Sequence, residues 1–178
     1  MRLSTVIVWL NGPFGAGKTT TAGLLTADGT WGLFDTERVG LMLRHALERA
    51  CPVPDFQDWP AWRAVSVAAV AAVARQRERP VVVPQTVVVE AYWSELRAGL
   101  TAAGQRVRAF TLHVDAAEHE RRIAADEVEP HAGGWRRERR ADYEAALGWL
   151  ARETTVIDTT ALDPAAVADR VRAELARP

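Results

Sequence analysis

The chain has 178 residues, of which 48 % are hydrophobic and 25 % are charged, as in an ordinary globular protein. This length predicts one domain, residues 1–178, with a full hydrophobic core. The formal net charge of −1 excludes a general electrostatic attraction to nucleic acid or to an anionic membrane surface.

Apolar runs alternate with segments of helical period along the chain, as in a parallel α/β sheet. Two helix starts carry capping residues: Asp115 lies three residues before Glu118, and Asp163 precedes Pro164. The candidate strands are Ser4–Leu10, Trp31–Phe34, Pro80–Val83, Arg106–His113 and Thr154–Ile157. The candidate helices are Lys18–Ala27, Glu37–Ala50, Ala61–Arg77, Ala91–Ala103, Ala116–Ala125, Trp135–Ala151 and Pro164–Ala176.

The first candidate strand runs into a glycine-rich turn that matches the phosphate-binding P-loop, G-x-x-x-x-G-K-[ST], from Gly12 to Thr19. Its glycines let backbone N–H groups converge on an anion at the start of the next helix. We expect Lys18 to reach the β- and γ-phosphates and the Thr19 hydroxyl to bind Mg²⁺. The alternative, a glycine-rich turn with a chance lysine, is disfavoured by the flanking strand and helix. The predicted nucleotide-binding residues are Gly12, Gly15, Ala16, Gly17, Lys18, Thr19 and Thr20.

Asp35 ends the second candidate strand, and the carboxyl ends of strands face the ligand crevice in a doubly wound sheet. A carboxylate there can accept a proton from a substrate hydroxyl, so Asp35 is the predicted general base. The alternatives are an N-cap for the helix that begins near Thr36 and an outer-sphere Mg²⁺ ligand. The neighbouring Arg38 is either a substrate contact or a solvated charge.

The third candidate strand is followed by Gln85 and Thr86, where P-loop motors have an acidic residue. This absence argues against an ATPase motor. It leaves Mg²⁺ to Thr19, to water and to Asp35.

Residues 126–142 are typical of a lid, because paired glycines precede a helix dense in arginine. Lid arginines can stabilise the charge on a transferring phosphoryl group, and Arg122 and Arg136 are the candidates. Pairing with Asp126 and Glu127 at helical spacing explains part of the arginine pattern without function.

Residues 51–60 hold three prolines and two aromatic residues between candidate helices. Such loops usually lie on the surface and often carry function. Some of the seven tryptophans should lie in the core, but those in or near loops can hold a flat ligand.

Cysteine and histidine usage excludes other kinds of site. The single Cys51 rules out an intrachain disulfide and fits a reducing cytoplasm, and the four histidines show no metal-ligand spacing. No signal peptide is visible, and the most apolar helical stretch, Val65–Ala74, is too short to cross a bilayer. We therefore expect a cytoplasmic protein without a transmembrane segment.

Together these motifs resemble the ATP-binding tunicamycin-resistance proteins and, more distantly, the chloramphenicol phosphotransferases and small nucleoside kinases. The resemblance covers most of the chain. It implies a three-layer α/β fold of the P-loop, nucleoside-kinase type, with a five-stranded parallel sheet and a helical lid. It rests on residues 9–19 (WLNGPFGAGKT), 34–40 (FDTERVG) with 43–44 (LR), 55–57 (DFQ) with 60–63 (PAWR), and 83–87 (VPQTV).

The resemblance also implies roles for particular residues. Asp35 falls where the chloramphenicol phosphotransferases have their catalytic base, and residues 55–63 would face the acceptor. One departure concerns the lid, where a second arginine often follows about one turn after the position of Arg122 and this chain has Asp126. The implied substrate-binding residues are Arg38, Phe56, Trp59, Trp62, Arg63, Gln85 and Thr86.

The favoured function is a Mg²⁺-dependent phosphotransferase that moves the γ-phosphate of ATP or GTP to a hydroxyl of a nucleoside-type antibiotic. The alternatives are a nucleotide-dependent protein that sequesters the drug and a small-metabolite kinase. Asp35 favours the enzyme, because sequestration needs no base, whereas the missing acidic residue after the third strand favours the binding protein. The sequence leaves open ATP against GTP, which depends on loops such as 158–160, and monomer against homodimer.

Overall fold

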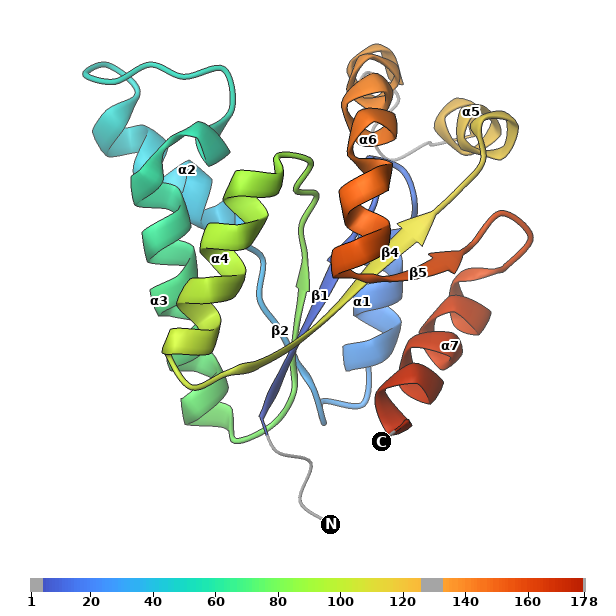
Figure 1. Cartoon of the computed structure of the whole chain (residues 1–178), viewed down its shortest axis with the longest axis horizontal. Coiled ribbons are helices and arrows are strands. Elements are labelled where there is room, and N and C mark those ends of the chain that lie inside the picture. Colours follow the sequence, from blue (N-terminus) through green and yellow to red (C-terminus); the bar gives the residue numbers. More distant parts are fainter. Residues whose placement is uncertain (1–4, 126–132, 178) are drawn as a thin grey trace.

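A computed structural model describes residues 5–125 and 133–177 of the chain. Its centre is a parallel sheet of five strands in the order β2-β3-β1-β4-β5 (Figure 1). The strands are β1 (Val6–Asn11), β2 (Gly32–Leu33), β3 (Val81–Pro84), β4 (Arg106–His113) and β5 (Thr155–Asp158). The helices are α1 (Lys18–Thr26), α2 (Glu37–Leu47), the 3₁₀ turn η1 (Phe56–Asp58), α3 (Pro60–Arg77), α4 (Glu90–Ala102), α5 (Ala116–Ala124), α6 (Gly133–Glu153) and α7 (Pro164–Ala176).

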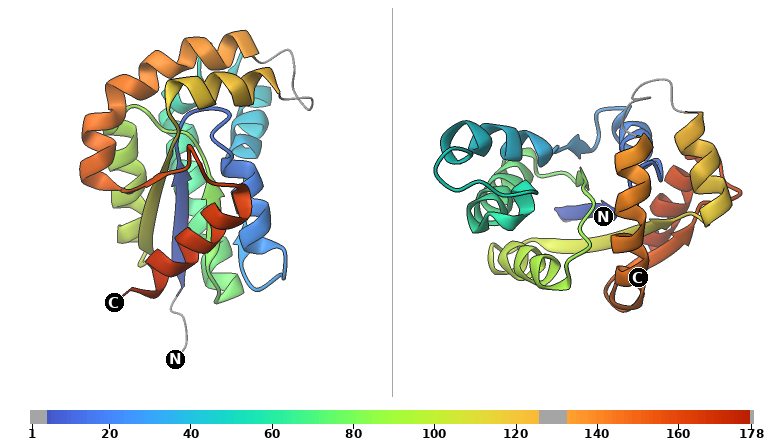
Figure 2. Two further views of the ribbon diagram at one scale, coloured as in Figure 1. Left: turned by 90° about the vertical axis from the view of Figure 1, so that its right-hand side faces the viewer. Right: turned by 90° about the horizontal axis from the view of Figure 1, so that it is seen from above.

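Both faces of the sheet are covered, which explains why β1 is apolar along its whole length. Ile7 and Trp9 point to one face, where they pack against α3, α4 and the C-terminal half of α6. Val8 and Leu10 point to the other face, where they pack against α1 and α7. Figure 2 shows the sheet with its covering helices from two further sides. The alternation of a strand thus divides the core into two layers.

The predicted elements are all present, with boundaries that differ by up to three residues. The Asp115 carboxylate accepts the Glu118 N–H at 2.7 Å, and the Asp163 carboxylate accepts the Ala166 N–H at 2.8 Å, so both predicted caps are confirmed.

Three local expectations differ from the structure. Helix α2 ends at Leu47, three residues before the expected Ala50, and β2 is only Gly32–Leu33. Gly133 and Gly134 lie in the first turn of α6 instead of preceding it. Residues 126–132 of the predicted lid fall outside the described residues. Within the described chain, no helix is both long enough and apolar enough to span a membrane.

Candidate active site

The P-loop joins β1 to α1 at the carboxyl edge of the central strand. Gly12, Gly15 and Gly17 have φ angles of +135°, +87° and +90°, which only glycine adopts without strain. A Cβ on Gly12 would also lie 2.5 Å from the Leu112 carbonyl oxygen, so β4 and the loop approach too closely for any side chain. A Cβ on Gly17 would have no heavy atom within 4 Å, so the glycine keeps this side of the loop open for an anion.

Lys18 lies folded over the P-loop. Its Nζ donates to the carbonyl oxygens of Gly12 at 3.1 Å and Pro13 at 2.8 Å, and it lies 5.3 Å from the centroid of the Phe14 ring. Thr19, the next residue, is exposed in the first turn of α1. Lys18 and Thr19 thus both lie in the first turn of α1, at the positive end of the helix.

The segment after β3 is tied directly to the P-loop. The Asn11 Oδ1 accepts the N–H groups of Gly12 at 2.8 Å and Val87 at 3.0 Å. The Thr86 hydroxyl donates to the Gly12 carbonyl oxygen at 2.8 Å. The residues that follow β3 are thus hydrogen-bonded to the first glycine of the loop.

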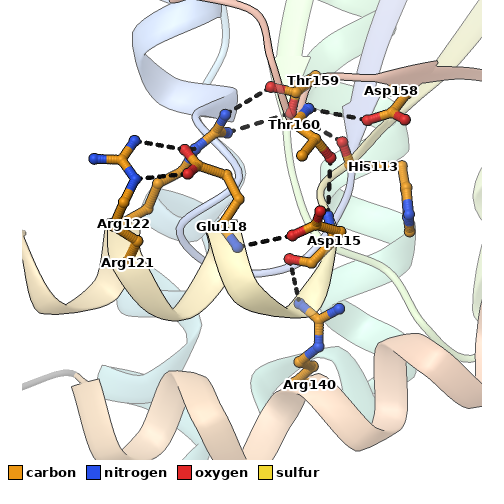
Figure 3. Close-up of polar contacts among 9 residues, drawn as sticks. All are labelled: His113, Asp115, Glu118, Arg121, Arg122, Arg140, Asp158, Thr159 and Thr160. Atoms are coloured by element: carbon orange, nitrogen blue, oxygen red, sulfur yellow. Dashed lines mark hydrogen bonds and ion pairs between the residues drawn. The ribbon is translucent and has the colours of Figure 1, made fainter.

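Helix α5 is connected to the loop after β5 by Arg122 (Figure 3). Its guanidinium donates to the Glu118 carboxylate at 2.7 Å, to the Thr159 carbonyl oxygen at 2.6 Å and to the Thr159 hydroxyl at 3.3 Å. Hydrogen bonds from Arg121 and Arg122 lower the pKa of Glu118 to about 2, so its carboxylate stays charged. The network fixes α5 beside the loop in which donor-base selectivity is predicted.

A pocket of about 110 Å³ lies beside the P-loop on the β3 side, opposite the Arg122 network. The Tyr92 hydroxyl donates to the Asp58 carboxylate at 2.9 Å across the pocket wall, and this bond raises the pKa of Tyr92. Arg139 lies 3.7 Å from the Asp55 carboxylate. The lining residues are Phe14, Pro54, Asp55, Gln57, Asp58, Thr86, Val88, Val89, Tyr92 and Arg139.

With this geometry in place, comparison with known proteins identifies the family. The family model described as AAA domain (AAA_33) matches residues 7–132. The chain belongs to this family. No curated protein sequence matches it significantly.

Solved structures of a tunicamycin resistance protein and of small-molecule kinases share the fold of this AAA-family chain. The tunicamycin resistance protein of Deinococcus radiodurans is 28 % identical, with 98 % of this chain and 97 % of that chain covered and a TM-score of 0.72. A gluconokinase from Sinorhizobium meliloti 1021 is 19 % identical, with coverages of 99 % and 94 % and a TM-score of 0.70. A shikimate kinase from Bacteroides thetaiotaomicron is 15 % identical, with coverages of 96 % and 98 % and a TM-score of 0.68. The resemblance and the kinase-like P-loop fold expected from the sequence are confirmed, and such a fold implies nucleotide binding.

Asp35 lies at the end of β2 with its carboxylate 40 % exposed. One oxygen accepts the Glu37 N–H at 2.9 Å, and the other lies 3.5 Å from the Arg38 guanidinium. The N-cap position of α2 is held by Thr36, so the contact with Glu37 closes a turn just before the helix and does not make Asp35 its N-cap. It leaves the charge of Asp35 at the surface, and the role of general base stays a prediction. Arg38 is 84 % exposed and pairs with Asp35.

Two predicted ligand-binding rings belong to the core, which corrects the expectation for Trp59 and Trp62. Their side chains are 5 % and 0 % exposed. The indole of Trp62 donates to the Thr36 carbonyl oxygen at 3.0 Å, and that of Trp59 donates to the Cys51 carbonyl oxygen at 2.7 Å. These rings anchor the start of α3 to residues 36 and 51. A large aromatic ring gains more free energy in the core than on the surface, even where it follows a proline-rich segment in the sequence. Phe56, half-buried, packs its ring 5.2 Å from that of Trp62.

Arg63 and Gln85 are also corrected, since both are buried and bonded to the protein itself. The Arg63 guanidinium donates to the Gln57 carbonyl oxygen and to the Glu95 carboxylate, and it lies 4.3 Å from the centre of the Tyr92 ring. The Gln85 side chain accepts the Thr36 hydroxyl, at 2.7 Å. Arg63 thus holds Gln57 and Tyr92 of the pocket wall in place, and Gln85 links the segment after β3 to Thr36.

Of the remaining predicted residues, Thr86 reaches the pocket, whereas the side chain of Arg136 lies outside the described residues. The sequence offered no motif for Tyr92 or His119. The His119 ring is 2 % exposed, packs against Gly15 and lies 2.6 Å from the Phe14 carbonyl oxygen through Nε2. Burial lowers the pKa of His119, so the neutral ring donates to that carbonyl.

Proposed function

We propose that the protein transfers the γ-phosphoryl group of ATP or GTP to a hydroxyl of a nucleoside-type antibiotic or a related small molecule. The observation that carries the proposal is the division of the site by the P-loop. Lys18 and the start of α1 lie at the centre, and the pocket lies on the β3 side. The contact between Arg122 of α5 and Thr159, in the loop after β5, lies on the β4–β5 side. This division would give donor and acceptor separate places that meet at the glycine loop.

The residues of the P-loop fit a nucleoside triphosphate with Mg²⁺. The loop N–H groups and Lys18 would hold the β- and γ-phosphates, and Thr19 would supply a hydroxyl to the metal. When bound, Mg²⁺ neutralises charge on the phosphates. Among the described residues, no group of histidine, cysteine and carboxylate side chains could hold a metal by itself. Thr19 would therefore share Mg²⁺ with phosphate oxygens and water.

Within this proposal, Asp35 accepts the proton of the attacking hydroxyl. Its carboxylate is at a strand end, is oriented by Glu37 and stays accessible to solvent. Arg122 and Arg136 are proposed to stabilise the charge of the moving phosphoryl group. For Arg122 this requires release from Thr159, to which it is bonded.

A nucleotide-dependent protein that sequesters the drug is the second candidate. It is favoured by the residue that follows β3. This residue is Gln85, whose side chain is hydrogen-bonded to Thr36, so a metal finds no carboxylate at this position. The similarity of the whole chain to a tunicamycin resistance protein suits either candidate.

Mass spectrometry separates the two candidates. Nucleoside antibiotics are incubated with the protein, Mg²⁺ and either ATP or GTP, and a mass gain of one phosphate is the expected result. The Lys18→Ala variant is the control and should give no product, because the loop loses its only ammonium contact to the phosphates. Tight drug binding without a mass gain across the panel would support sequestration and contradict phosphotransfer.

A further inference from the structure

We infer that the pocket beside Phe14 accepts an uncharged ring with adjacent hydroxyl groups, such as a sugar unit, and rejects acceptors that carry a carboxylate or phosphate at this position. The inference rests on the proposed function and names its substrate class. It concerns a site that lies between η1, the β3–α4 segment, the P-loop and α6.

The pocket wall presents hydrogen-bond acceptors. Asp55 and Asp58 supply carboxylates, and Gln57 supplies a carboxamide oxygen. The Gln57 side chain is buried, at 8 % exposure, and its Nε2 donates to the Thr86 carbonyl oxygen at 3.0 Å. Its Oε1 has no hydrogen-bond donor within the described part of the chain. A ligand that fills the pocket must therefore bring donors, because a buried acceptor without a partner is costly.

The acceptors are held in place by their neighbours. The Asp55 carboxylate accepts the Gln57 N–H at 3.0 Å, which fixes the turn between them. The Tyr92 hydroxyl donates its hydrogen bond to Asp58, so toward a ligand the Tyr92 oxygen can act only as an acceptor. Arg63 lies against the Tyr92 ring and keeps it in this orientation. Fixed pairs of oxygen acceptors suit the two donors of adjacent hydroxyl groups.

Charge excludes an anionic ligand. Among the described lining residues two carboxylates face one guanidinium, that of Arg139. Arg139 is engaged by Asp55 at 3.7 Å and by Asp142 at 3.4 Å. The Arg63 guanidinium, which lies against the Tyr92 ring, is bound to Glu95. The Lys18 ammonium, 5.3 Å from the Phe14 ring, belongs in the proposed function to the phosphates of the nucleotide. Among the described lining residues the carboxylates therefore outnumber the guanidinium, and a charge mismatch of this kind is how a site rejects the wrong partner.

The other walls are apolar and suit the carbon face of a ring. They are formed by Pro54, Val88, Val89 and the Phe14 ring. Phe14 belongs to the P-loop itself, and Thr86 in the pocket wall donates to Gly12. A ring held here therefore lies against the phosphate-binding loop, where a hydroxyl can reach the γ-phosphoryl group.

The charge of the pocket is measured by thiol labelling, which needs no knowledge of the substrate. In a Cys51→Ser background, Val89→Cys places a thiol at the pocket, at a position that is 43 % exposed. This protein is reacted with a cationic and an anionic methanethiosulfonate, and each rate is divided by the rate for a small free thiol. The reference is the same variant carrying Asp58→Asn, which keeps an oxygen for Tyr92. We expect Asp58→Asn to lower the cationic-to-anionic rate ratio at position 89 by roughly three- to tenfold. A normalised ratio at position 89 that favours the anionic reagent, or no effect of Asp58→Asn, would overturn the inference.

Acceptor selection is then measured on matched pairs: nucleosides against their 5′-monophosphates, and hexoses against the corresponding hexonates. With ATP or GTP and Mg²⁺, the uncharged member of any pair that gains phosphate should be preferred at least tenfold by kcat/KM. Preference for the anionic member would overturn the inference. If no pair gains phosphate, the failure is of the proposed phosphotransfer, and the labelling ratio still decides the charge selection of the pocket.

Discussion

Three glycine-to-alanine substitutions separate the geometric demands of the P-loop from ordinary helix propensity. Gly12→Ala meets two penalties. A side chain at a φ of +135° costs about 1–3 kcal/mol in strain. The new Cβ, 2.5 Å from the Leu112 carbonyl oxygen, costs about 1–3 kcal/mol more, because that oxygen belongs to the rigid backbone of β4. The expected loss of unfolding free energy is about 4 kcal/mol.

Two matched variants isolate these penalties. Gly17→Ala has the unfavourable φ of +90° but no heavy atom within 4 Å of the new Cβ, so only the strain of about 1–2 kcal/mol remains. Gly23→Ala lies within α1, has open space around its Cβ and should stabilise the protein by about 0.5–1 kcal/mol.

The assay is urea denaturation of each variant without nucleotide, supported by thermal melting. For a chain of this length about 1 kcal/mol shifts Tm by 2–4 °C, so Gly12→Ala should melt about 8–16 °C lower than the natural chain. Gly17→Ala should fall between Gly12→Ala and the natural chain, and Gly23→Ala should lie above it. Equal losses for Gly12→Ala and Gly17→Ala would refute the argument that β4 constrains the loop.

Three further outcomes test the site. Asp35→Asn keeps the oxygen that accepts the Glu37 N–H but loses the base, so kcat should fall by about 10²–10⁴ with unchanged nucleotide affinity. An unchanged kcat would leave Asp35 with only its turn contact to Glu37. Burial lowers the pKa of His119 below its unfolded value of about 6.5, so the unfolded chain binds the extra proton and stability is lost as the pH falls below 6.5. His119→Gln should reduce this loss between pH 7.5 and 5.5 in urea titrations, and equal losses in both proteins would refute it. Trp62→Phe removes the donor to the Thr36 carbonyl and should cost about 1–3 kcal/mol of stability with an unchanged acceptor KM; a raised KM at full stability would return Trp62 to the ligand site.

The sequence by itself determined the features whose physics is local. The P-loop between Gly12 and Thr19, the strands and the caps at Asp115 and Asp163 each depend on a few consecutive residues, and the structure has them where the sequence predicts them. Local patterns suffice there because backbone conformation and hydrogen bonding within a turn are decided by residue type and spacing.

Only the tertiary structure decided which side chains line the pocket and which are buried. Trp62 and Arg63 follow a surface loop in the chain, yet the packing of α3 buries both: Trp62 lies in the core, and Arg63 is bonded to Gln57 and Glu95. His119 and Phe14 are 105 residues apart and Thr86 and Gly12 are 74 apart, so no window of sequence contains either contact. The pocket likewise joins segments that meet only because the sheet places β3 beside β1. The P-loop motif therefore could not predict which charged side chains line the pocket.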